Sequence, residues 1–131
     1  MVGYWKFFPA LGEDADGYGV IPVWGFADAV ESKAEGVPVG DRLFGYFPPA
    51  SHLKMIPTRI KEGRFIDGME HRAQLPIVYN SYIRVHNEPG YNSDTDNARM
   101  LFFLLHITSF CIWDSLQIKD CLLYTSPSPR D

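Results

Sequence analysis

Tyr79 and Asn80 are neighbours in the chain and carry the side chains best suited to chemistry. A tyrosine hydroxyl beside a carboxamide can polarise a carbonyl group, or hold a ribose or an amide. We therefore predict that Tyr79 is catalytic and that Asn80 binds a cofactor. A buried tyrosine that is capped by a local hydrogen bond is an equally good interpretation of the same pair.

His52 is the second catalytic candidate, because an imidazole changes its charge near neutral pH and can donate a proton. A half-buried structural histidine is the more common alternative. The four histidines, at positions 52, 71, 86 and 106, show no H-x-x-x-H or H-E-x-x-H spacing, and there is no C-x-x-C. Zinc sites need such spacings, so we predict no metal. The chain also lacks a G-x-S-x-G nucleophile motif and a glycine-rich phosphate loop.

Aromatic side chains provide candidate walls for a substrate site. The first ten residues include Trp5 and Phe8, and a second aromatic run includes Tyr46. Flat apolar surfaces suit planar ligands, so we predict that Trp5, Phe8 and Tyr46 bind substrate. Packing of the same rings in the protein core is the alternative, and for the first ten residues it is favoured.

Charge and composition exclude several classes of protein. The net charge is −4 and Lys and Arg form no cluster, so nucleic acid is not an expected partner. Met1 is not followed by a basic and then an apolar run, so no signal peptide is visible and we expect a cytoplasmic protein. The apolar segment Met100–Leu116 is interrupted by polar residues, so we predict a buried helix that joins two domains rather than a membrane span.

The elements that must position these residues begin with two strands. Residues 22–31 have apolar side chains on both faces, which predicts a strand covered on both sides. Val37–Val39 is expected to be extended, and Gly40-Asp41 forms a turn. Arg42 to Phe47 follows as an aromatic-rich strand.

Later segments complete the expected fold. Residues 50–56 are predicted to form a strand, and Phe65-Ile66 a short extended piece. Residues 69–75 predict a helical turn with Glu70 and Arg72 pointing outward. Residues 76–85 have a spacing compatible with helix. A polar loop follows, and a final helix is capped at position 96 or 97.

The last eleven residues, 121–131, read CLLYTSPSPRD, which is the translation of a common sequencing adapter. We therefore expect this tail to be non-native and the natural protein to continue past Asp120. Met1 is a candidate internal start. Without the tail, Cys111 is the sole cysteine, which suits a reducing compartment.

Several runs of the sequence resemble a known family. The segment from Val39 to Gly45, V-G-D-R-L-F-G, together with the strand before it, resembles the GroES-like domain of medium-chain dehydrogenase/reductases. Gly3 to Asp120 resembles more closely a bacterial family of domain-of-unknown-function (DUF) proteins, distant relatives of those enzymes. The matching runs are G-Y-W-K-F-F-P-A near the start, residues 21–32 and 39–52, D-G-M-E-H-R-A-Q-L-P from Asp67, and the V-Y-N that follows it.

The resemblance implies an α+β, β-rich fold. Residues 1–68 would form a GroES-like, partly open β-barrel, and residues 69–120 a helical part that leads to a missing Rossmann-like domain. It also implies an NADPH-dependent oxidoreductase acting on a small carbonyl or quinone-like compound, with NADPH bound mainly by the missing domain. This fragment alone would be inactive, and the full-length protein is a candidate homo-oligomer. A non-catalytic module that binds a small molecule remains the alternative, and a structural adaptor is a third.

Overall fold

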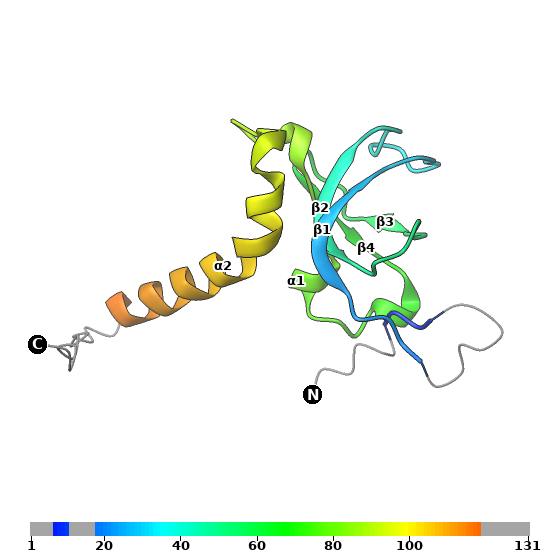
Figure 1. Ribbon diagram of the computed structural model, residues 1–131. Helices are drawn as coiled ribbons and strands as arrows, with labels where there is room; N and C mark the ends of the chain where they lie inside the picture. Colours follow the sequence, from blue (N-terminus) through cyan, green and yellow to red (C-terminus); the bar gives the residue numbers. More distant parts are fainter. Residues whose placement is uncertain (1–6, 11–17, 119–131) are drawn as a thin grey trace, which may run out of the picture. The chain divides into compact units, whose positions relative to one another are not determined.

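The computed structural model describes residues 7–10 and 18–118. The described chain is α+β, with an open antiparallel five-stranded sheet followed by a C-terminal helix (Figure 1). It separates into two units, of which the first ends at Asp96 and the second begins at Asn97. The predicted domain boundary at residue 68 stays a prediction. Trp5 and the tail 121–131 lie outside the described residues.

The sheet has the strand order β1-β2-β5-β4-β3, and every neighbouring pair is antiparallel. Gly25 lies opposite Gly45 where β1 and β2 pair along their full length. β5 is the central strand, between β2 and β4. The strands are β1 (Val23–Asp28), β2 (Arg42–Phe47), β3 (Pro57–Thr58), β4 (Arg64–Asp67) and β5 (Ser81–Arg84).

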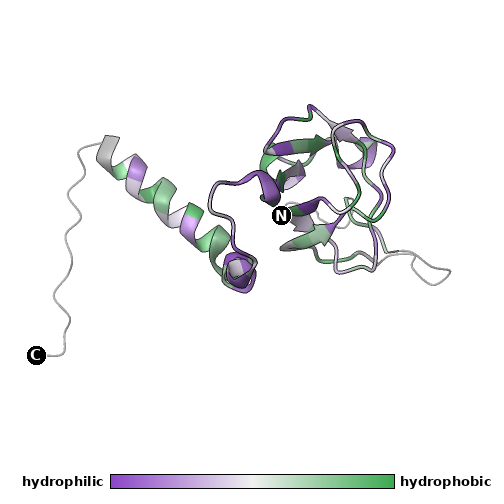
Figure 2. Ribbon diagram, turned by 90° about the horizontal axis from the view of Figure 1, so that it is seen from above, coloured by the Kyte–Doolittle hydropathy of each residue, from purple (hydrophilic) through white to green (hydrophobic). Residues whose placement is uncertain are grey.

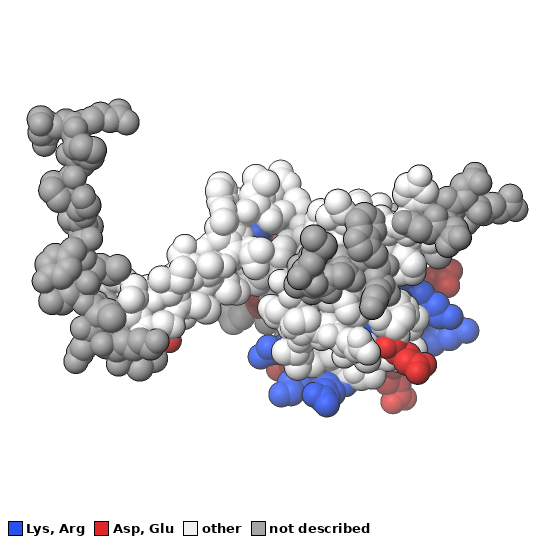
Figure 3. Space-filling model, turned by 90° about the horizontal axis from the view of Figure 1, so that it is seen from below, with Lys and Arg blue, Asp and Glu red and all other residues white. Residues whose placement is uncertain are grey.

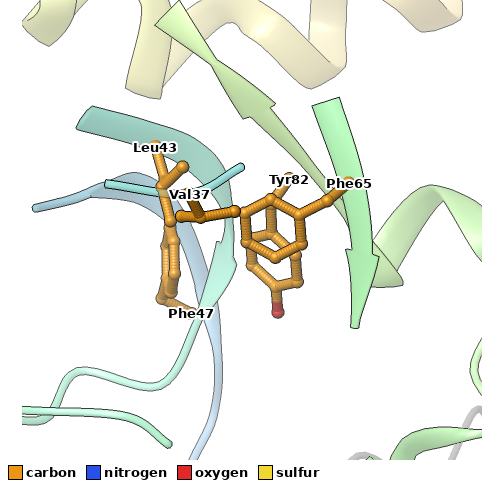
Figure 4. Close-up of a cluster of buried hydrophobic side chains, with 5 residues drawn as sticks. All are labelled: Val37, Leu43, Phe47, Phe65 and Tyr82. Atoms are coloured by element: carbon orange, nitrogen blue, oxygen red, sulfur yellow. The ribbon is translucent and has the colours of Figure 1, made fainter. Parts of the chain in front are cut away.

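Strand β2 is covered on both faces, because its alternating side chains enter two separate hydrophobic clusters. Leu43 and Phe47 point to one face and Tyr46 to the other. The first cluster, named here the Tyr82 cluster, contains Val37, Leu43, Phe47, Phe65 and Tyr82 (Figure 4). The second, the Tyr46 cluster, contains Phe7, Phe8, Tyr46 and Leu75. The strand predicted within residues 22–31 is confirmed as β1, whose Ala27 and Trp24 pack against the first and the second cluster, and β2 is the more deeply buried of the two strands.

Helical segments connect and follow the strands. A 3-10 turn η2 (Glu70–Arg72) and a single α-helical turn α1 (Ile77–Asn80) lie between β4 and β5. Two further 3-10 turns, η3 (Val85–Asn87) and η4 (Ser93–Thr95), lead to the long helix α2 (Asp96–Ile118). The predicted helical turn at 69–75 and the final helix that starts near residue 96 are confirmed.

The predicted strand at residues 50–56 is wrong. This segment lies beside β4 but forms no ladder until β3 begins at Pro57. Two of its backbone groups bond to side chains: the Lys54 carbonyl accepts from the Arg72 guanidinium, and the Ile56 amide donates to the Asp67 carboxylate. Val37–Val39 likewise forms no strand.

The predicted helix at residues 76–85 is also wrong for its second half. After the single turn of α1, residues 81–84 become the central strand β5. The pairing of β5 with both β2 and β4 outweighs the local helical spacing, because a central strand buries side chains on two sides. Arg72, expected to point outward, is 2 % exposed, whereas Glu70 is exposed as expected.

The predicted helix over Met100–Leu116 is part of α2, and its burial against a second domain stays a prediction. Its apolar residues are exposed in this chain, including Leu101, Phe102, Leu105, Phe110 and Trp113. Apolar residues recur along its length (Figure 2). By length and composition alone, Ser93–Leu116 could cross a membrane, but a single such helix is weak evidence for a span.

Candidate functional site

Three of the predicted site residues meet on one face of the sheet. The Tyr46 ring lies 4.9 Å from the Tyr79 ring and 6.0 Å from the Phe8 ring, between centroids. The Trp24 ring joins them at 5.4 Å from Tyr46 and 6.0 Å from Tyr79. We call Phe8, Trp24, Tyr46 and Tyr79 the aromatic cluster.

Local structure explains how Tyr79 reaches this face. Pro76 precedes α1 with an extended backbone, and its carbonyl accepts the Tyr79 amide at 2.9 Å. Proline cannot donate a backbone hydrogen bond, which suits the start of a helical turn. Leu75, just before it, is buried in the Tyr46 cluster. The buried leucine and the tight turn together place the half-buried Tyr79 ring against the sheet.

Asn80 is 4 % exposed, and its amide has two different roles. The Nδ2 group donates to the Arg72 carbonyl at 2.6 Å, which is a structural hydrogen bond. Among the described residues, the buried Oδ1 atom has no hydrogen-bond partner. Asn80 therefore joins α1 to η2 and retains one acceptor, so its predicted cofactor role stays a prediction.

His52 lies apart from this arrangement. It is exposed, and its Nδ1 atom is 3.0 Å from Ser51 Oγ. Within residues 7–10 and 18–118, none of the observed hydrogen bonds or ring contacts joins His52 to the aromatic cluster. The structure thus brings together Tyr79, Phe8 and Tyr46, with Asn80 adjacent in the chain, but gives His52 no part in the cluster.

A buried ion pair beside the site was missed by the sequence reasoning. Arg72 Nε donates to Asp67 Oδ2 at 2.6 Å, and Nη2 lies 2.5 Å from the same oxygen. Nη2 also donates to the Lys54 carbonyl, and Nη1 lies 3.0 Å from His71 Nε2. The Arg72 guanidinium lies 5.7 Å from the Phe8 ring centre, so it makes a cation–π contact with one ring of the aromatic cluster. Asp67 and Arg72 are five residues apart, and nothing in that spacing indicates that the two side chains form a buried pair.

The V-G-D-R turn is a structural motif in this chain. Gly40 has a φ of +86°, which favours glycine. Asp41 accepts a hydrogen bond from Arg84 of β5 at 2.5 Å. Arg42 pairs with Asp28 of β1 and with Asp96, each at 3.1 Å. Asp41 therefore links the turn to β5, and Arg42 links β2 to β1 and to Asp96.

The pKa of Arg42 reflects these partners. Partial burial acts to lower the pKa of its guanidinium, but the charge of Asp28 and the hydrogen bond to Asp96 raise it overall. Burial and a hydrogen bond to Asp96 raise the pKa of the Tyr91 hydroxyl, which donates to Asp96 Oδ2 at 3.0 Å. Arg42 remains charged at every physiological pH.

The arrangement brings together four aromatic rings, the hydroxyls of Tyr46 and Tyr79, and one amide oxygen of Asn80. No group of three or more His, Cys, Asp or Glu side chains that could hold a metal occurs in the described part of the chain. The charged side chains visible in Figure 3 are of mixed sign, and no broad basic surface appears in that view. A shallow hollow on α2, lined by Ile107, Thr108, Cys111 and Ser115 among others, is mostly apolar. Phe8 and Tyr46 are 3 % and 7 % exposed, so their rings pack in the hydrophobic core, as the alternative interpretation expected, whereas Trp24 and Tyr79 are half-buried.

Comparison with known proteins gives one finding. A family model described as "Protein of unknown function (DUF2855)" matches residues 1–126. Neither a curated protein nor a solved structure matches the chain.

Proposed function

The chain belongs to the DUF2855 family of proteins of unknown function, and we propose that its sheet is the GroES-like lobe of a medium-chain, NADPH-dependent oxidoreductase. The substrate would be a small carbonyl or quinone-like compound, and the protein would work in the cytoplasm. The observation that carries the proposal is the aromatic cluster, in which the Tyr79 ring lies 4.9 Å from the Tyr46 ring.

The proposed role of this lobe is to hold the substrate. The half-buried Tyr79 ring would lie against the substrate, with the buried rings of Tyr46 and Phe8 packed behind it, and the Tyr79 hydroxyl would donate to the substrate carbonyl as it gains negative charge. Such a donor contributes typically about 10²-fold or more to the rate. NADPH would supply the hydride.

The fit of the residues to NADPH is partial. The buried Asn80 Oδ1 could accept a hydrogen bond from the carboxamide of a nicotinamide ring. The 131 residues contain no G-x-G-x-x-G phosphate loop, so the rest of the cofactor would be held by a Rossmann-like domain outside this chain. Asn80 is therefore the one residue here that we propose for the cofactor.

Calorimetry with NADPH tests the proposal directly. The protein encoded by the complete gene should bind NADPH, whereas the 131-residue chain should not. Tight binding of NADPH to the short chain would contradict the proposal that another domain holds most of the cofactor. Absence of binding by the full-length protein would rule out the oxidoreductase.

Substitution of Tyr79 tests its role in the same full-length protein. Tyr79→Phe should lower kcat about 10²-fold and leave the affinity for NADPH unchanged. Tyr18→Phe is the matched control, because Tyr18 is exposed and lies outside the aromatic cluster. Equal activity of Tyr79→Phe and Tyr18→Phe would exclude Tyr79 as the donor.

A non-catalytic ligand-binding module is the second candidate, and the position of His52 favours it. The predicted proton donor lies at the surface beside Ser51, and the Asn80 Nδ2 group is used in a structural bond. A dinucleotide fingerprint in the complete gene would favour the enzyme, and its absence would favour the binding module.

A further inference from the structure

The first residue of helix α2 is held by a cluster of side chains that belongs to the sheet unit. Asp96 is 7 % exposed, and its Oδ2 atom accepts three hydrogen bonds. Two come from Arg42, from Nε at 3.2 Å and Nη2 at 3.1 Å, and one comes from the Tyr91 hydroxyl at 3.0 Å. We call Arg42, Tyr91 and Asp96 the Asp96 clasp.

Arg42 is itself fixed in place from its other side. Its Nη1 group donates to both carboxylate oxygens of Asp28 at 3.1 Å, and its guanidinium lies 5.2 Å from the Phe26 ring centre. Asp28 and Phe26 are both on β1, and Arg42 is the first residue of β2. The clasp therefore ties Asp96 to the two longest strands of the sheet.

The chain that leads into Asp96 is closely hydrogen-bonded. The Tyr91 amide donates to the Glu88 carbonyl at 3.2 Å. The Asn92 side chain accepts from the Asp94 amide at 3.0 Å, and the Asn92 carbonyl accepts from both the amide and the hydroxyl of Thr95. These bonds restrict the backbone up to Asp96, so little motion can arise before that residue.

The division of the chain falls directly after this residue. The sheet unit ends at Asp96 and the second unit begins at Asn97, although α2 is continuous from Asp96 to Ile118.

We propose that the Asp96 clasp is the anchored pivot of this chain. The clasp fixes the point from which α2 departs and limits the directions that the helix can take relative to the sheet. Loss of the charge-assisted bonds from Arg42 frees the first turn of α2 and widens the range of helix directions. This inference does not depend on the proposed reaction.

Distance measurement between two spin labels tests the pivot. One label is placed on the native Cys111 of α2, which is exposed, and the other on the exposed position 35 of the sheet unit through Glu35→Cys. Cys121→Ser removes the remaining thiol. Samples with a single label identify any distances that arise between separate chains.

Three variants of the doubly labelled protein distinguish the loss of the Asp96 clasp from the loss of any charge near the start of the helix. Asp96→Asn keeps the shape of the side chain but removes its charge, and it should at least double the width of the distance distribution. Tyr91→Phe removes one hydrogen bond and should widen it less. Asp94→Asn is the matched control, because it removes an exposed charge two residues earlier, outside the clasp, and should leave the width unchanged.

Two outcomes would overturn the pivot. An unchanged width in Asp96→Asn would show that the clasp does not restrain the helix. Equal widening in Asp94→Asn would show that any lost charge near the helix start has the same effect. Circular dichroism checks that each variant stays folded. If Asp96→Asn unfolds, the Tyr91→Phe variant serves as the test, because it retains both charges. A wider distance distribution in Tyr91→Phe would support the pivot, and an unchanged width would overturn it.

Discussion

Gly45 and Tyr82 form the tightest contact in the centre of the sheet. A Cβ atom built on Gly45 would lie 2.4 Å from Tyr82 Cδ1, too close for any side chain. The Tyr82 side chain is fully buried, and its hydroxyl donates to the Tyr46 carbonyl at 3.0 Å. One glycine thus allows an aromatic ring to cross from β5 over β2, and the hydrogen bond fixes the ring there.

Gly45→Ala should destabilise the sheet unit by about 1–3 kcal/mol, because the new methyl group forces the Tyr82 ring out of its position. Urea unfolding followed by tryptophan fluorescence measures the loss. Gly63→Ala is the matched control, since nothing lies within 4 Å of a Cβ atom built on Gly63. Equal stability of the two variants would contradict the packing argument.

The stability of the protein should fall at alkaline pH through Tyr82. Burial, and then the negative charge of Asp67, raise the pKa of the Tyr82 hydroxyl above its ordinary value of 10.0. Above pH 10 the unfolded chain loses this proton while the folded chain keeps it, so the unfolded chain binds fewer protons. The contribution of Tyr82 to the free energy of unfolding is therefore constant below about pH 10 and falls above it by up to about 1.4 kcal/mol per pH unit.

Tyr82→Phe isolates this effect. The variant should be about 1 kcal/mol less stable at pH 7, because it loses one hydrogen bond, and its deficit should shrink as the pH rises from 10 to 11. Urea unfolding at each pH measures both quantities, with Tyr18→Phe as the exposed control. A deficit that is the same at pH 7 and pH 11 would show that Tyr82 does not titrate differently in the folded chain.

At the scale of elements, the Arg72–Asp67 pair connects segments that share no ladder. Asp67 ends β4, Arg72 ends η2, and the Lys54 carbonyl belongs to the irregular segment before β3. The second Asp67 oxygen accepts from the amides of Ile56 and Met69. This network supplies the hydrogen bonds that a strand at residues 50–56 would have found in a ladder.

Arg72→Met should cost about 3–5 kcal/mol, because it leaves the Asp67 carboxylate buried without its cation. The double variant Arg72→Met with Asp67→Asn should recover part of the loss, since no buried charge remains. Chemical unfolding measures each. Arg64→Met, at an exposed position of β4, is the control, and a loss of similar size there would contradict the role of burial.

The elements also show what local sequence can predict. The strand at 42–47 was predicted within its observed bounds, because its turn residues and aromatic run are local signals. β5 was missed because its strand state depends on pairing with β2 and β4, which lie far away in the sequence. The burial of Arg72 could not be predicted either, because it depends on carbonyl and carboxylate partners from other segments. Tyr79, Tyr46 and Phe8 were chosen from their residue types alone, and their roles in catalysis and substrate binding stay predictions.

At the scale of the whole molecule, the two units differ in how completely they bury their apolar side chains. The sheet unit buries aromatic side chains on both faces of β2, in the Tyr82 and Tyr46 clusters. Helix α2 instead leaves Leu101, Phe102, Leu105, Phe110 and Trp113 exposed in this chain. A helix that is apolar around its circumference requires apolar surroundings, which is consistent with the proposed second domain.

The exposed helix also determines how a cell would treat this chain if it were made alone. Chaperones and quality-control proteases recognise segments rich in Leu, Phe and Trp that an unassembled polypeptide leaves open to water. The Thr108 hydroxyl already donates to the Leu104 carbonyl, so it does little to increase the affinity of that surface for water. The 131-residue polypeptide would therefore be short-lived in the cell even though its sheet is folded, and its abundance would depend on how quickly a neighbour shields this helix.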